Sequence, residues 1–215
     1  HNDRLNHTPL MQFVKRRKIN QFEDSEKPPP YGRITTEFRP AQSDALELMF
    51  RGDNLRSGIY ILPCGGGKTL LGIAAAVRSG SKHVLILVPN TTIEDQWKKR
   101  LYDRANVRAK TLNEVGTLTK KQLNENPVVA VVSWNMLAWG GCKEDTKENE
   151  ALAGTRINGR KIAAVENILF CFWDLIIIDE VHNIRSPQNQ CLLSKLSYNT
   201  MIGLTATASK DEKFP

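Results

Sequence analysis

The sequence predicts an α/β fold in which a mainly parallel, doubly wound sheet carries helices on both faces. Three short runs, residues 83–88, 128–133 and 175–178, are almost entirely apolar. Such runs are typical of strands that are buried on both faces of a parallel sheet. Stretches with apolar residues at helical spacing lie between them, and a helix is the usual connection between parallel strands.

The expected elements alternate along the chain. A helix over residues 39–50 comes first, with Ala45, Leu48 and Met49 on one side. The predicted strands cover residues 58–62, 83–88, 128–133, 175–178 and 201–204, and residues 107–110 are a candidate edge strand. The predicted helices between the first strands cover residues 69–77 and 92–101. No internal repeat interrupts this order, so the alternation indicates one α/β domain.

The ends and the middle of the chain differ from this pattern. Residues 1–37 are polar, contain the basic run at 15–18 and three prolines at 28–30, and are predicted to be an N-terminal arm or linker. The basic run is either a solvated surface or a patch that contacts phosphate or directs nuclear import. Residues 38–215 form the predicted domain, with a polar insertion near residues 140–160.

Composition narrows the class of protein. The 215 residues include 30 Lys and Arg against 23 Asp and Glu, a net charge of +7, and 40% of them are hydrophobic. This hydrophobic content excludes wholesale disorder, and the charge favours polyanionic partners only weakly. No apolar run approaches the roughly 18–20 residues that cross a bilayer, and nothing resembles a signal peptide. Four cysteines without C-x-x-C spacing are typical of reduced thiols, so we expect an intracellular protein without membrane contact.

A glycine-rich segment follows the first predicted strand. Residues 62–69 read Leu-Pro-Cys-Gly-Gly-Gly-Lys-Thr, with Gly65, Gly66 and Gly67 directly before Lys68 and Thr69. Backbone N–H groups of such a loop, together with the helix N-terminus, can surround a phosphate. Lys68 would then reach the β- and γ-phosphates, and the Thr69 hydroxyl would bind Mg²⁺. The plain alternative is a glycine-rich turn with an incidental Lys-Thr pair.

An acidic pair follows the most apolar predicted strand. Asp179 and Glu180 lie just past residues 175–178, at the carboxyl end of a strand, where α/β sheets bind their ligands. Asp179 can hold the metal directly or through water, and Glu180 can polarise an attacking water. The alternative is an Asp-Glu pair that only starts a turn or caps a helix. After the last predicted strand, the hydroxyls of Thr205 and Thr207 could contact this acidic segment.

In this order the motifs resemble those of superfamily 2 helicases and translocases. The resemblance is closest to the type named after xeroderma pigmentosum group B, the XPB family. It is carried by residues 38–42, 56–58, 62–65, 67–68, 96–97, 179–182 and 203–207. In that family this stretch is the first of two RecA-like domains. The resemblance therefore implies a RecA-like P-loop NTPase fold with ATP and Mg as ligands.

The resemblance also implies roles for single residues. Gln42, with Arg39 beside it, is similar to the glutamine that reads adenine. His182 is similar to a catalytic histidine that links the γ-phosphate region to Thr205 and Thr207. Segments after the second and third predicted strands resemble those that hold a nucleic-acid backbone, and their residues are Pro89, Asn90, Ser133 and Asn135. Such contacts position a strand without reading its sequence.

Four further features bear on how far the resemblance to the family extends. The XPB family has Arg-Glu-Asp after Thr-Ala-Thr, whereas this chain has Lys210-Asp211-Glu212. Trp97 is expected to be a core residue, and Cys64 a small loop residue. The cysteines are too widely spaced for the iron–sulfur helicases, which need four clustered ones.

The expected function is that of the ATP-binding lobe of a DNA helicase or translocase in nucleotide-excision repair or transcription initiation. DNA is the expected partner, with RNA not excluded, along with a second RecA-like domain of the same polypeptide and a multisubunit complex. In a eukaryote the expected location is the nucleus. The alternatives are a viral or restriction-type motor of the same superfamily, and a non-catalytic nucleic-acid interaction module on the same fold.

Overall fold

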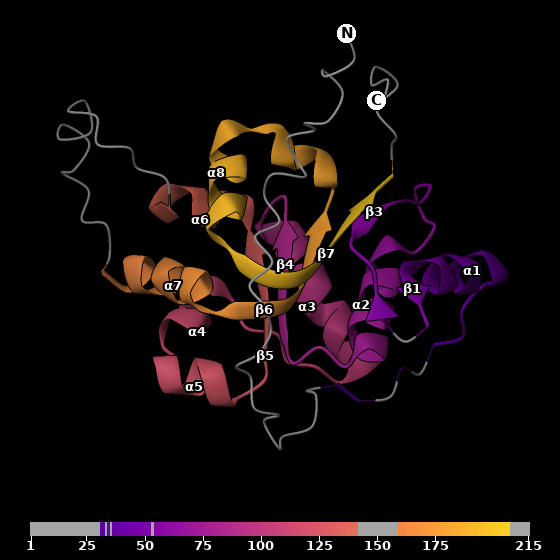
Figure 1. The fold of residues 1–215 in the computed structure, drawn as a ribbon, viewed down its shortest axis with the longest axis horizontal. Coiled ribbons are helices and arrows are strands. Elements are labelled where there is room, and N and C mark those ends of the chain that lie inside the picture. The colour runs from indigo at the N-terminus through magenta and orange to yellow at the C-terminus, as the bar shows by residue number, and fades with distance from the viewer. Residues whose placement is uncertain (1–30, 33, 35, 53, 142–158, 207–215) are drawn as a thin grey trace, which may run out of the picture.

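A five-stranded parallel sheet forms the centre of the molecule (Figure 1). The computed structural model describes residues 31–32, 34, 36–52, 54–141 and 159–206. The strand order is β3-β7-β6-β4-β5. The strands are β3 (Gly58–Ile61), β4 (His83–Val88), β5 (Val128–Ser133), β6 (Phe172–Asp179) and β7 (Ser197–Thr205). All pairs in this sheet are parallel, which confirms the predicted fold class.

Alternate residues of the central strands enter two separate hydrophobic cores. On β4, Val84 and Ile86 pack into one core, whereas Leu85 and Leu87 pack into the other. On β6, Ile177 packs into the same core as Val84 and Ile86, and Ile176 packs into the other core. Because side chains alternate between the faces of a strand, both faces must be covered to keep these residues from water. The sheet is therefore doubly wound, as the continuous apolar runs predict.

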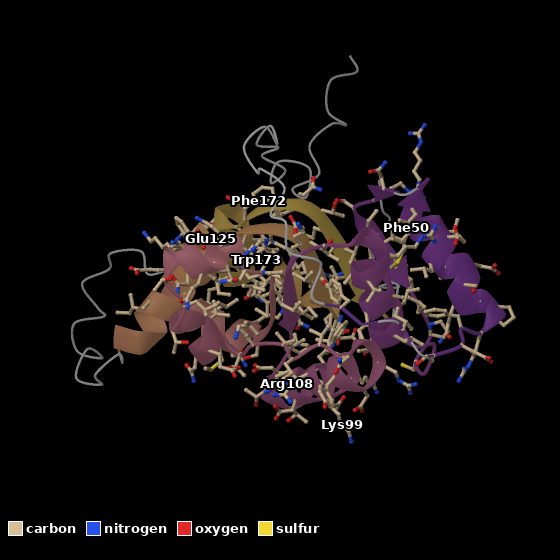
Figure 2. All side chains as sticks on the ribbon, turned by 90° about the horizontal axis from the view of Figure 1, so that it is seen from below. Phe50, Lys99, Arg108, Glu125, Phe172 and Trp173 are labelled. Carbon is tan, nitrogen blue, oxygen red and sulfur yellow. The ribbon has the colours of Figure 1, made fainter. Side chains whose placement is uncertain are left out.

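Helices cover the two faces unequally (Figure 1). One face carries α2 (Lys68–Ser79) and α3 (Thr91–Ala105), and α1 (Pro40–Met49) packs against α2. The other face carries α4 (Leu112–Gly116), α5 (Lys120–Glu125), α6 (Trp134–Gly141), α7 (Gly159–Phe170) and α8 (Pro187–Lys195). Among the labelled side chains of Figure 2, Trp173 lies in the second core, whereas Lys99 lies on the outer side of α3.

Local capping explains where several helices begin. The Asn90 side chain accepts a hydrogen bond from the N–H of Ile93 at the start of α3. Thr111 and Thr119 each form a capping box at the start of α4 and α5. Side-chain oxygens at these positions satisfy N–H groups that have no partner in the first turn of a helix.

Several expectations about single elements need correction. Residues 107–110 form no strand, and only Lys110 makes one isolated bridge, to Ala130. A two-stranded antiparallel ribbon, β1 (Phe50–Arg51) with β2 (Asn54–Leu55), was not predicted. Strands β6 and β7 extend well past the predicted residues, because both are long enough to pair along seven registered positions.

The arm and the insertion fall mainly outside the described residues. Residues 1–30 of the predicted arm and residues 142–158 of the predicted insertion belong to this part, and α7 already begins at Gly159. Within the described part of the chain no helix is both long and apolar enough to cross a membrane.

The cysteines are not all reduced thiols. Cys64 and Cys171 are free, whereas Cys191 forms a disulfide, so the expectation is wrong at Cys191. Burial raises the pKa of the Cys171 thiol to about 12, with a smaller contribution from the charge of Asp174. Cys171 is therefore an inert core residue, because the reactive form of cysteine is the thiolate.

Candidate functional site: the carboxyl edge of the sheet

The predicted motifs meet at one edge of the sheet. The glycine-rich loop follows β3, the acidic pair ends β6, and Thr205 ends β7. Because the three strands are parallel and neighbours in the order β3-β7-β6, their carboxyl ends share this edge. The N–H of Leu62, where the loop begins, donates to the carbonyl of Thr205 over 2.9 Å. This hydrogen bond extends the β3–β7 pairing up to the loop.

The loop has a tight backbone that only glycine accommodates well. Gly65 and Gly67 have φ of 75° and 90°, in the left-handed region. Between them, the N–H of Gly66 donates to the carbonyl of Pro63 over 2.9 Å. Gly67 is the N-cap of α2, so Lys68 and Thr69 are the first two residues of the helix. This is the strand–loop–helix arrangement that anion-binding loops use.

Gln42 packs against this loop from α1. Its Nε2 donates to the carbonyl of Gly66 over 2.9 Å, and its Oε1 accepts from the N–H of Arg39 over 3.0 Å. The Gln42 side chain is thereby held between the start of α1 and the loop, and the residue is only 8% exposed. A Cβ atom on Gly67 would lie 2.2 Å from Gln42 Nε2. The structure therefore places Gln42 and Arg39 beside the glycine-rich loop, while their contact with adenine stays a prediction.

Lys68 and Glu180 form the central ion pair of the site. Lys68 Nζ lies 2.6 Å from Glu180 Oε1, and both side chains are mostly shielded, at 16% and 29% exposure. The two residues are 112 positions apart in the sequence. The fold thus brings the lysine of the loop onto the second carboxylate of the acidic pair, as expected if both serve one phosphate site.

Glu180 also contacts two other predicted residues through its second oxygen. Thr205 Oγ1 donates to Glu180 Oε2 over 3.4 Å, and His182 Nδ1 lies 3.6 Å from the same oxygen. His182 is exposed, on the short helix η3 (Val181–Arg185). Glu180 therefore joins Lys68, Thr205 and His182 in one cluster. Thr207, the other predicted coupling residue, and Lys210, Asp211 and Glu212 lie outside the described residues.

The backbone at Glu180 is unusual. Its φ and ψ are 54° and 65°, a left-handed conformation that residues other than glycine seldom adopt. Both the N–H and the side-chain amide of Asn183 donate to the carbonyl of Glu180, over 3.0 and 2.9 Å. Asn189 in turn donates to the carbonyl of Asn183 over 2.7 Å. This chain of hydrogen bonds holds the strained residue, and sequence reasoning did not identify Asn183 or Asn189.

Asp179 is buried and held by an indole. Trp97 Nε1 donates to Asp179 Oδ2 over 2.8 Å, and the two residues are 1% and 7% exposed. Burial raises the pKa of the Asp179 carboxyl, and the charge of Glu180 raises it further. The Trp97 hydrogen bond and the charge of Lys68 lower it, but the net direction is upward. Trp97 is thus a core residue, as expected, with an additional contact in the site.

Thr69 has a partner that the motifs do not predict. Arg100 Nη1 donates to Thr69 Oγ1 over 2.8 Å. Arg100 lies three residues after Trp97 on α3, and residues at this spacing share one face of a helix. That spacing was the available signal, although the sequence alone predicted only a core position for Trp97.

The residues at this edge suit magnesium. The Thr69 hydroxyl and the Asp179 carboxylate are hard oxygen donors, which Mg²⁺ prefers. Among the described residues no group of three or more His, Cys, Asp or Glu side chains could hold a metal by itself. Mg²⁺ usually takes one or two protein ligands and fills its shell with phosphate oxygens and water.

The predicted nucleic-acid residues follow β4 and β5 at the same edge. Asn90 and Asn135 are exposed, and Pro89 is partly buried. Ser133 is 1% exposed, and its Oγ has no hydrogen-bond partner within the described part of the chain. Glu94 on α3 accepts a hydrogen bond from the Ser133 backbone. The structure brings the four residues to neighbouring strand ends, with the Ser133 hydroxyl facing the interior, and their contact with nucleic acid stays a prediction.

The five parallel strands with helices on both faces define a class: a RecA-like α/β domain. The structure is similar to the Sulfolobus solfataricus SWI2/SNF2 ATPase core in complex with dsDNA, with a TM-score of 0.56 and 19% identity over 88% of this chain and 36% of that one. It is also similar to the UvsW helicase from bacteriophage T4, with a TM-score of 0.53 and 16% identity over 88% and 59%. At these identities the likeness concerns the fold.

Residues 35–210 match the family described as ResIII, type III restriction enzyme, res subunit, and the chain belongs to this family. The helicase/translocase subunit XPB1 of general transcription and DNA repair factor IIH from Arabidopsis thaliana is 30% identical over 175 residues, 81% of this chain and 21% of that protein. The XPB subunit from Dictyostelium discoideum is 28% identical over 83% of this chain and 20% of that protein. The chain thus spans about a fifth of the length of these relatives. The resemblance to the XPB type is confirmed.

Proposed function

We propose that the chain is the ATP-binding lobe of an ATP-dependent DNA helicase or translocase that acts in nucleotide-excision repair, transcription initiation or both. The Lys68–Glu180 ion pair carries this proposal, because it joins the phosphate loop to the acidic pair within 2.6 Å. The names of the XPB-type relatives support the activity and the pathway.

Each residue of the site has a distinct task in this proposal. The loop N–H groups and Lys68 bind the phosphates of ATP, and Thr69 and Asp179 hold Mg²⁺. When bound, Mg²⁺ neutralises charge on the phosphate oxygens. Glu180 orients the attacking water, with His182 and Thr205 around its second oxygen. Because Lys68 and Glu180 neutralise each other without nucleotide, their ion pair must separate before Lys68 can bind a phosphate.

The complete motor needs more than this lobe. In the proposal a second RecA-like domain of the same polypeptide supplies arginines to the γ-phosphate, a contribution of roughly 10³–10⁵ in rate in other phosphoryl-transfer enzymes. Pro89, Asn90, Ser133 and Asn135 lie along the path of the DNA backbone, and RNA is a second possible strand. The full protein works in a multisubunit complex in the nucleus, as the names of the relatives suggest.

Two other functions share part of this evidence. A restriction-type or viral motor would use the same ATP site, and the nucleic acid that stimulates ATP hydrolysis distinguishes it from a repair or transcription motor. A non-catalytic interaction module would not need the ion pair of Lys68 with Glu180 or the buried Asp179. The presence of all three together favours the ATPase.

Calorimetric titration of ATP with Mg²⁺ into the chain tests the proposal. We expect weak binding that Lys68→Ala abolishes and that Lys99→Ala, an exposed lysine on α3, leaves unchanged. A chain that binds no nucleotide would contradict the ATPase and revive the interaction module. Robust DNA-stimulated hydrolysis by these 215 residues would instead contradict the need for a second domain.

A further inference from the structure

Arg100 occupies an oxygen that the proposed function assigns to the metal. Its Nη1 donates to Thr69 Oγ1 over 2.8 Å. Thr69 is buried at the start of α2, whereas Arg100 is exposed on α3. A hydroxyl oxygen has two lone pairs, and Arg100 uses one of them. The guanidinium is thus bound at the phosphate loop, on the residue that follows Lys68.

The same face of α3 contacts the second proposed metal ligand. Trp97, three residues before Arg100, donates to Asp179 Oδ2 over 2.8 Å. Because an indole N–H is a neutral donor, Trp97 can keep this contact when a cation arrives at Asp179. Arg100 differs, since its guanidinium is charged at every physiological pH and has no lone pair with which to bind a metal.

Two cations on one oxygen repel each other. A guanidinium at hydrogen-bond distance from Thr69 Oγ1 and Mg²⁺ on the same oxygen would lie within a few ångströms, where like charges interact strongly in a partly buried site. One of them must leave. Arg100 can leave without disturbing the core, because its side chain is exposed and long.

We propose that Arg100 is a resident cation of the metal site: it holds the Thr69 hydroxyl when Mg²⁺ is absent, and Mg²⁺ must displace it to bind. This inference rests on the proposed ATP site and adds a positioning residue to it. Arg100 therefore raises the Mg²⁺ concentration that the site requires, and metal binding changes the contact between α3 and Thr69.

The affinity of the chain for a fluorescent ADP, measured over a series of Mg²⁺ concentrations, tests this proposal without relying on hydrolysis. In Arg100→Gln the Mg²⁺ concentration for half-maximal tightening of ADP binding should fall about tenfold, which corresponds to about 1.4 kcal/mol. Arg100→Lys, which keeps the charge, should stay close to the unchanged chain. Lys99→Gln removes the same charge from the neighbouring residue and should have little effect, because the Lys99 side chain is exposed and projects outward from the molecule (Figure 2).

Measurements without Mg²⁺ separate this role from a general effect on the site. There Arg100→Gln should bind ADP no more tightly than the unchanged chain, because it loses a positive charge near the loop. An unchanged or higher Mg²⁺ requirement in Arg100→Gln would overturn the proposal. Arg100→Ala repeats the test with a simple truncation of an exposed side chain, should Arg100→Gln fold poorly. If the unchanged chain bound no ADP at any Mg²⁺ concentration, the ATP site itself would be refuted instead.

Discussion

The indole nitrogen of Trp97 donates a hydrogen bond of 2.8 Å to Oδ2 of Asp179, although the two residues are 82 positions apart. Both lie in the interior, where a charged carboxylate without a partner is costly. Helix α3 therefore stabilises the ionised form of Asp179, the form that the proposed metal site requires. The first two predictions below follow from this contact.

Trp97→Phe should destabilise the chain by about 2 kcal/mol, because a hydrogen bond to a charged group is lost while the carboxylate stays buried. It should also raise the pKa of Asp179 further, since the Trp97 bond is among the contributions that lower it. Urea denaturation measures the loss of stability. In an Asp179→Asn background the cost of Trp97→Phe should shrink, and an equal cost in both backgrounds would contradict the coupling.

Asp179→Asn should make the chain more stable at neutral pH. The folded-state pKa of Asp179 is raised above its ordinary value, chiefly by burial. The unfolded chain therefore ionises first, and stability falls as the pH rises from the unfolded pKa, about 3.9, to the folded one. Urea midpoints from pH 3.5 to 7 should show the variant gaining over the unchanged chain as the pH rises. A variant that is less stable at pH 7 would show that the charge is well compensated.

Asp174→Asn should have the opposite pH dependence. Burial raises the pKa of this carboxyl, but hydrogen bonds from His83 and Lys82 outweigh it, and the net shift is downward. The N–H groups of Lys82 and His83 donate to Asp174 Oδ2 over 2.7 and 2.8 Å. The stability that Asp174 contributes is thus present above its unfolded pKa and lost as the pH falls through the folded value. The variant should lose stability at pH 7, and this loss should shrink only as the pH falls from about 3.9 towards the lower folded pKa of Asp174. A loss that does not vary with pH would refute this.

Gly67→Ala should weaken both the fold and the phosphate loop. Gly67 has a φ of 90°, and a left-handed conformation costs other residues about 1–2 kcal/mol. The added Cβ would also displace Gln42, whose Nε2 would lie 2.2 Å away. Gly67→Ala combined with Gln42→Ala should recover the steric part and leave the backbone part. Additive losses of stability in the double variant would contradict the clash.

Glu180→Gln should bind ATP more tightly than the unchanged chain. In the unchanged chain Lys68 forms an ion pair with the Glu180 carboxylate 2.6 Å away, and this ion pair competes with the ATP phosphates for the lysine. In the complete protein the same variant should hold ATP without hydrolysing it, since the residue that orients water is neutral. Filter binding with labelled ATP and a single-turnover assay measure the two effects. Normal hydrolysis by Glu180→Gln would remove Glu180 from its proposed role.

The sheet was predictable because its central strands are continuous apolar runs that can be recognised in the sequence. Residues 83–88 and 128–133 are strands with the predicted bounds, since no other element buries six consecutive residues on two faces. The short helices α4 and α5 were missed, although Thr111 with Glu114 and Thr119 with Gln122 have capping-box spacing. Their five and six residues are too few for a helical period to show.

The motifs of the site could be predicted from the sequence, but the side-chain contacts between different helices and loops could not. Lys68 and Glu180 each belong to a segment with a recognisable pattern, so their meeting at one edge of a parallel sheet could be expected. The contacts of Arg100 with Thr69 and of Gln42 with Gly66 join residues 31 and 24 positions apart. Such pairs depend on how helices α1 and α3 pack on α2, and a single sequence contains no pattern for that packing.

The position of β7 between β3 and β6 has a further consequence. Lys68 follows one neighbour of β7, Glu180 ends the other, and Thr205 ends β7 itself. Strand pairing can shift only in whole residues, and a shift by one residue would turn each buried side chain to the opposite face. The smallest tolerable slip is thus two residues, about 6.6 Å in a parallel sheet. The sheet therefore cannot change the distance between Lys68 and Glu180 in small steps. Small changes of this distance can come only from the backbone of the loop and from side-chain rotamers.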